Sequence, residues 1–213
     1  MTREPLVSPR ARPSVGPRCA GLVLAPGASA GRDQPSLVAI DDAVSKNGIV
    51  VERMDFGYRL SGRRAPDRPP VLVAAVVEHA RELARLSGAT QNRIALGGRS
   101  MGGRMASVAV AEGLPSAGLV LVSYPLHPPG HPEKSRVEHL GSIDVPCLFV
   151  SGTRDAFGTR DELESATASI TGPVTHVWID GGDHGLRRRD AEVASIVASW
   201  LRGPSKRKRP QTS

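Results

Sequence analysis

The sequence predicts an α/β protein built on a doubly wound, mainly parallel sheet of about six strands. The first observation is that short apolar runs alternate regularly with amphipathic helices, the order expected of parallel strands joined by right-handed crossovers. The second is composition: 39% of the 213 residues are apolar but only 3% aromatic. Val, Leu, Ile and Ala must therefore supply the core, as in parallel sheets covered on both faces. This length suits one domain.

The first half of the chain supplies two strands and two helices. Apolar residues 20–25 end at a Pro-Gly pair and predict a buried strand. A helix with an apolar stripe begins near residue 35 and ends at Asn47-Gly48, a pair suited to a left-handed cap. A second strand is expected over residues 49–56, a loop over the Gly-, Pro- and Arg-rich residues 57–70, and an amphipathic helix over residues 71–86.

The second half repeats the alternation. It begins with the stretch 92–104, which predicts a short strand, a glycine-rich corner and the start of a helix. A proline-rich loop at 125–132 precedes a weak helix expected near residues 134–140. The remaining elements are expected as strands over 118–123, 146–150 and 176–179, and as helices over 105–111, 161–170 and 191–201.

The two ends of the chain are expected to lie outside the folded domain. Residues 1–18 are rich in Pro and Arg and predict a disordered or loosely attached segment, residues 19–203 the domain, and residues 204–213 a basic disordered tail. Much of the net charge of +7 lies in these ends, which indicates solvated tails rather than a specific nucleic-acid interface. Without a membrane-spanning apolar run or a secretory signal, we expect a cytoplasmic protein with no membrane partner.

The cysteines and glycines argue against a metal or a cofactor. Cys19 and Cys147 lack metal-ligand spacing and are expected to be small apolar fillers rather than a disulfide or a zinc site. No G-x-G-x-x-G pattern follows the first strand, which disfavours a reductase or nucleotide-binding protein.

A candidate nucleophile stands at the glycine-rich corner. Gly98-Arg99-Ser100-Met101-Gly102 fits G-x-S-x-G, in which a serine occupies a strained turn between a strand and a helix, so that its hydroxyl is exposed above the sheet. The pattern alone also fits an ordinary glycine-rich loop. The strand predicted before it and the helix predicted after it favour the nucleophile.

A serine nucleophile needs a base, and the base needs an acid that orients it. Asp155 follows the strand predicted at 146–150, and His184 follows the strand predicted at 176–179. The order Ser, Asp, His is the order found in α/β hydrolases. Asp161 is a rival acid, but its place at the start of a helix explains it equally well.

The oxyanion of an acyl-transfer intermediate needs two backbone donors. In this arrangement one is the N–H after the nucleophile and the other lies in the loop after the first strand here. These positions are Met101 and Ala28, with Ser29 as the next choice.

Several cationic and polar residues are expected at the same edge of the sheet. Arg99 lies beside the serine, and guanidinium groups suit the binding of carboxylates and phosphates. We therefore expect a small-molecule substrate carrying an anionic group, although solvent-facing or bracing roles would also explain these arginines. The predicted substrate-binding residues are Arg63, Arg64, Arg99, Tyr124 and His127.

Taken together, these segments resemble small α/β hydrolases of the dienelactone-hydrolase type, in the branch that includes testis-expressed hydrolase-like proteins and a subunit of the non-specific lethal histone acetyltransferase complex. The resemblance covers residues 21–201. It implies a minimal hydrolase fold without a large lid domain, with Ser100, Asp155 and His184 at the positions of the catalytic triad. Strands that usually precede the first strand here are missing, and the exposed edge this leaves favours a homodimer. The supporting segments are residues 25–31, 97–102, 123–130, 151–155 and 182–184.

Two functions remain open from the sequence. The first is a serine hydrolase that cleaves a small ester, thioester or lactone. The second is a catalytically silent interaction or scaffold module that keeps the fold, since the resemblance includes members that act as scaffolds. The presence of all three triad residues favours the enzyme.

Overall fold

The computed structural model describes residues 6–7 and 19–202. The predicted basic tail at 204–213, and most of the N-terminal segment predicted to be disordered or loosely attached, lie outside the described residues. Within the described part of the chain, no helix is both long and apolar enough to cross a membrane.

The described residues form one sheet with the strand order β1-β7-β6-β5-β4-β2-β3. Strands β2 to β7 pair in parallel, which confirms the predicted parallel sheet of six strands. The chain moves outward from β2 to β3, returns to β4 beside β2, and then continues through β5, β6 and β7 in the other direction. The order therefore reverses beside β2 and β4, and such a reversal opens a crevice at the carboxyl ends of the strands. The parallel strands are β2 (Gly21–Ala25), β3 (Val50–Arg53), β4 (Ile94–Arg99), β5 (Leu119–Val122), β6 (Cys147–Gly152) and β7 (Val174–Ile179).

The seventh strand corrects an expectation from the sequence. Strand β1 (Leu6–Val7) pairs antiparallel with β7, with Leu6 opposite Trp178. We expected no strand before residue 19, because two apolar residues between prolines are too few to show the alternation typical of strands.

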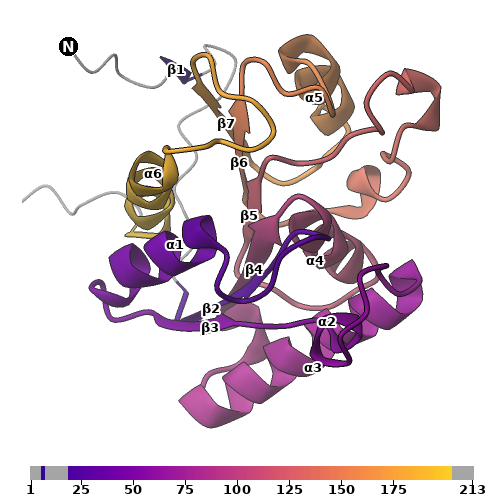
Figure 1. Ribbon diagram of the computed structural model, residues 1–213. Coiled ribbons are helices and arrows are strands. Elements are labelled where there is room, and N and C mark those ends of the chain that lie inside the picture. Colours follow the sequence, from indigo (N-terminus) through magenta and orange to yellow (C-terminus); the bar gives the residue numbers. More distant parts are fainter. Residues whose placement is uncertain (1–5, 8–18, 203–213) are drawn as a thin grey trace, which may run out of the picture.

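Helices cover both faces of the sheet (Figure 1). Helices α1 (Pro35–Ser45) and α6 (Asp190–Arg202) pack against each other on one face, over a cluster that includes Leu22 and Leu24. The intervening Val23 points to the opposite cluster, in accord with the two-residue repeat of a strand. The helices on that opposite face are α3 (Pro69–Ser87), α4 (Met101–Ala111) and α5 (Arg160–Thr167).

Two segments differ from the elements expected. Helix α2 (Gly57–Leu60) lies in the predicted loop, where Tyr58 is fully buried and anchors the turn. Two 3₁₀ turns, η2 (Pro132–Lys134) and η3 (Leu140–Ser142), replace the helix predicted near 134–140. Helix α4 begins at Met101, within the stretch 92–104 that is expected to start a helix. The glycines in its first turn allow it to approach β2 closely, since a Cβ on Gly102 would lie 2.2 Å from the Ala25 carbonyl oxygen.

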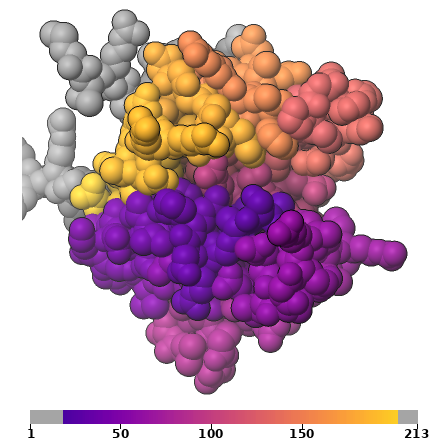
Figure 2. Space-filling view, in the orientation of Figure 1, coloured from indigo at the N-terminus to yellow at the C-terminus, as the bar shows by residue number. Residues whose placement is uncertain are grey.

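The two halves of the sequence form two adjoining blocks in space. Figure 2 shows the N-terminal half, in indigo and purple, below the C-terminal residues in orange and yellow. Strand β4 lies between β2 and β3 on one side and β5, β6 and β7 on the other. Residues at its carboxyl end therefore lie near loops from both halves of the sequence.

Candidate active site

Ser100 occupies the strained corner that its motif predicts. It follows β4 directly and has φ 50° and ψ −118°, a conformation that costs a non-glycine residue roughly 1–3 kcal/mol. Neighbouring backbone holds the corner in place, since the Ser100 N–H donates to the Val122 carbonyl at 2.9 Å. Gly98 has φ +152°, and a Cβ there would lie 2.1 Å from the Ala25 carbonyl oxygen. Only glycine fits at that position.

The structure brings the three predicted triad residues into one hydrogen-bonded chain. The distance between Ser100 Oγ and His184 Nε2 is 2.9 Å, and His184 Nδ1 lies 2.9 Å from each carboxylate oxygen of Asp155. A carboxylate can only accept, so Nδ1 carries the proton and Nε2 is left to accept from the serine hydroxyl. The side chain of Asp155 is only 2% exposed. Asp161, the rival acid, lies in the first turn of α5.

Two further residues hold His184 in this position. The ring of Phe157 stacks on the imidazole with centroids 3.9 Å apart and planes inclined by 27°. Arg99 donates from Nη2 to the His184 backbone carbonyl at 2.5 Å. Burial lowers the pKa of Arg99, while the carboxylates of Asp190, Asp155 and Asp183 oppose that shift. One N–H of Arg99 is thus used to hold the loop that carries His184, and the charge of Arg99 is partly balanced by the three aspartates.

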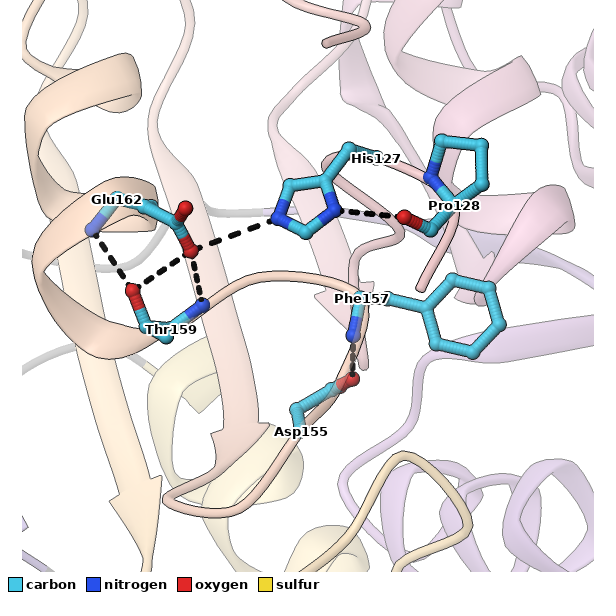
Figure 3. A network of polar contacts seen from close by, with 6 residues as sticks. All are labelled: His127, Pro128, Asp155, Phe157, Thr159 and Glu162. Carbon is cyan, nitrogen blue, oxygen red and sulfur yellow. Dashed lines mark hydrogen bonds and ion pairs between the residues drawn. The ribbon is translucent and has the colours of Figure 1, made fainter. Parts of the chain in front are cut away.

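His127 lies between Glu162 and Pro128, above the loop that carries Asp155 in Figure 3. Its Nδ1 donates to the Pro128 carbonyl at 2.8 Å, and its Nε2 lies 3.4 Å from Glu162 Oε2. Its backbone N–H donates to the Phe157 carbonyl at 3.0 Å, while the Phe157 N–H donates to Asp155 Oδ1 at 2.9 Å. His127 therefore connects the loop that carries Asp155 to α5, whose capping box also uses Glu162.

The loop after β2 is braced from two sides. Gln34 Oε1 accepts from the Gly27 N–H at 3.1 Å, and the Tyr58 hydroxyl donates to the Ala28 carbonyl at 2.6 Å. The Ala30 N–H donates to the Gly27 carbonyl at 3.1 Å. A trans peptide directs its N–H opposite to its C=O. The bond to the Gly27 carbonyl therefore sets the direction of the Ala28 N–H, and the bond to the Ala28 carbonyl sets that of the Ser29 N–H. These are the two loop donors expected from the sequence.

A cavity of about 710 Å³ opens over Ser100 and His184. The predicted oxyanion residues Met101, Ala28 and Ser29 line it, as does Arg99. The other predicted substrate-binding residues do not. The lining also includes Gln34, Asp67, Leu72, Arg104, Arg136, Phe157 and Arg187.

Four of the expected substrate-binding residues are not among the residues that line the cavity. Tyr124 is buried at the carboxyl end of β5, where its hydroxyl donates to the Arg136 carbonyl at 3.2 Å. His127 is buried in the network just described. Arg63 is exposed and pairs with Asp67 at 2.7 Å, and Arg64 is exposed and is not one of the lining residues. Placement on the same edge of a sheet does not decide which side chains face a cavity.

Among the residues that sequence reasoning missed, Arg104 carries a usable signal. It lies four residues after Ser100, one helical turn along α4, and hence on the same side of the helix. Arg136 and Phe157 lie in loops without periodicity, and only the tertiary fold brings them to the cavity.

A nucleophile corner, a base and an acid at three strand ends of a doubly wound sheet are the defining arrangement of α/β hydrolases. The family model described as the alpha/beta hydrolase domain matches residues 18–202. The chain belongs to that family.

Other known proteins resemble the chain in fold or over a short segment. An alpha-beta serine hydrolase homologue from Coxiella burnetii aligns with a TM-score of 0.70 and 18% identity, over 94% of this chain and 98% of that one. Dienelactone hydrolase from Anabaena variabilis aligns with the same TM-score and identity, over 86% of each chain. Epoxide hydrolase A from Mycobacterium tuberculosis is 38% identical over 63 residues, which are 29% of this chain and 20% of that protein.

Proposed function

We propose that the protein is a serine hydrolase that cleaves a small ester, thioester or lactone through an acyl-enzyme on Ser100. The observation that carries this proposal is the hydrogen-bonded chain from Ser100 Oγ through His184 to Asp155, with each contact at 2.9 Å. In this proposal His184 is the base and Asp155 the acid that orients it. The similarity in fold to dienelactone hydrolase supports a place among enzymes of that type.

The reaction proceeds in two halves. The serine oxygen attacks the substrate carbonyl as its proton passes to His184 Nε2, and the imidazolium then gives that proton to the leaving group. Water, deprotonated by the same nitrogen, releases the acyl group and regenerates the serine. Asp155 stays ionised and stabilises the charged ring in both halves.

The tetrahedral intermediate of each half carries an oxyanion. We assign its donors to the Met101 N–H, at the start of α4, and the Ala28 N–H, with the Ser29 N–H as the alternative. Both loop residues and Met101 line the cavity. The cavity volume of about 710 Å³ suits a small substrate.

The experiment is turnover of short p-nitrophenyl esters, thioesters and lactones by the wild type and by Ser100→Ala. We expect the wild type to hydrolyse at least one class and the variant to lose activity by several orders of magnitude. Undiminished turnover by a folded Ser100→Ala variant would contradict the proposal. A folded wild type without turnover on any class would favour the scaffold module instead.

A further inference from the structure

The lining of the cavity is strongly cationic. The lining residues include four arginines but one acidic residue, Asp67. The Asp67 carboxylate is already paired, because both its oxygens accept from Arg63, at 2.7 and 3.2 Å. Arg99 is also committed, to the His184 carbonyl and the surrounding aspartates. Arg187 is exposed to solvent at the mouth. The uncompensated charge within the cavity belongs to the remaining two arginines.

Arg104 and Arg136 are partly buried and have no ion pair within the described part of the chain. The Nε of Arg104 is shielded from solvent and has no hydrogen-bond partner there. The side chain of Arg136 makes one long hydrogen bond within the described residues, from Nη1 to the Pro125 carbonyl at 3.4 Å. Burial, and then the charge of Arg104, lower the pKa of Arg136.

Arg104 and Arg136 come from different parts of the fold and both line the cavity that opens over Ser100. Arg104 lies one turn after Ser100, whose carbonyl accepts from the Arg104 N–H at 3.0 Å. Side chains on a helix lean toward its N-terminus, and for α4 that end is the nucleophile corner. Arg136 comes from the loop between η2 and η3, where its N–H donates to the Leu126 carbonyl at 2.9 Å.

Partly burying two guanidinium groups without a counter-ion costs free energy, and a bound anion would offset that cost. A planar carboxylate matches the fork of donors that a guanidinium presents. We propose that Arg104 and Arg136 form a carboxylate-binding subsite, so that the substrate is an ester or thioester bearing a free carboxylate. This inference rests on the proposed hydrolase function and assigns substrate recognition to residues other than Arg63, Arg64, Tyr124 and His127.

The kinetic test compares two p-nitrophenyl esters of equal chain length, the monoester of adipic acid and the ester of hexanoic acid. The wild type is expected to prefer the adipate ester in kcat/KM, and added salt to weaken that preference. In Arg104→Gln and Arg136→Gln the adipate-to-hexanoate ratio is expected to fall by about tenfold to a hundredfold, the value of a charge-assisted hydrogen bond. Arg81→Gln, which removes an equal charge from an exposed position on α3, keeps the wild-type ratio.

A binding measurement separates the failure of this inference from the failure of the hydrolase proposal. Calorimetric titration of Ser100→Ala with monomethyl adipate needs no turnover, and affinity is expected to fall about tenfold or more when Arg104→Gln or Arg136→Gln is added. Equal affinity in these proteins, or an equal kinetic ratio in all variants, would overturn the subsite. Binding that depends on both arginines in a protein without hydrolase activity would keep the subsite and reject the enzyme.

Discussion

Replacing Tyr58 by phenylalanine should impair turnover without affecting substrate binding. The hydroxyl of this fully buried residue donates to the Ala28 carbonyl at 2.6 Å. That bond fixes the plane of the peptide between Ala28 and Ser29, which carries the alternative oxyanion donor, the Ser29 N–H, and adjoins the peptide that carries the assigned donor, the Ala28 N–H. Tyr58→Phe removes one oxygen, keeps the ring and leaves the loop free to turn.

The magnitudes follow from what the hydroxyl holds. Losing this hydrogen bond should lower the free energy of unfolding by about 1 kcal/mol. The loss stays this small because Ala28 is only partly buried, so that water in the cavity can bind to its carbonyl instead. For a domain of this size that lowers Tm by about 2–4 °C. Complete removal of an oxyanion donor costs about 10²- to 10³-fold in kcat. A donor that is misaligned rather than removed should cost about tenfold in kcat, with KM nearly unchanged.

The assay measures kcat and KM on p-nitrophenyl butyrate together with thermal melting. Ser116→Ala is the matched control, because this buried hydroxyl donates to the Ile94 carbonyl at the opposite end of β4 at 3.0 Å. It should lower Tm by a similar amount and leave kcat unchanged. Wild-type kcat in Tyr58→Phe, with Tm lowered as in the control, would refute the link between this hydroxyl and the oxyanion loop.

Two further predictions concern the acid and the buried histidines. Asp155→Asn should lower kcat by up to about 10⁴-fold, because the imidazole is then held in the wrong tautomer. Asp161→Asn should have little effect on kcat. If the two effects were reversed, Asp161 and not Asp155 would be the acid. Burial lowers the pKa of His139 and of His176 from 6.5 to about 4. Between pH 4 and 6.5 the unfolded chain therefore binds more protons than the folded chain does. Stability should therefore fall as the pH drops from 6.5 to about 4. Urea unfolding across this range should show a shallower fall in His139→Gln and His176→Gln, and an unchanged slope in both would contradict this origin.

The central strands could be predicted because each is a short apolar run buried on both faces, as residues 147–150 illustrate. Leu6-Val7 carries too little pattern to distinguish a two-residue edge strand from a loop. The turn at Tyr58 depends on a tertiary contact with the Ala28 carbonyl, and a local reading of a Gly- and Arg-rich segment contains no signal for it. The 3₁₀ turns near Pro132 differ from the expected helix for the same kind of reason, because side chains from other elements hold the residues between them. The Tyr124 hydroxyl donates to the Arg136 carbonyl at 3.2 Å, and Ser107 Oγ lies 2.8 Å from His139 Nε2.

The candidate site could be predicted to the extent that strand order determines it. Ser100, Asp155 and His184 each follow a strand, and parallel strands bring their carboxyl ends to one edge. Which neighbours face the cavity depends on side-chain packing. Tyr124 shares that edge but turns inward, whereas Arg136 approaches from a loop.

The most direct test of the central claim is labelling with a fluorophosphonate, which reacts with activated serine nucleophiles, followed by mass spectrometry of the labelled peptide. The account predicts one adduct on Ser100 in the wild type, strongly slowed labelling in His184→Ala, and none in a folded Ser100→Ala. A wild type that stays unlabelled while its cavity admits the probe, or equal labelling of the wild type and Ser100→Ala, would contradict it.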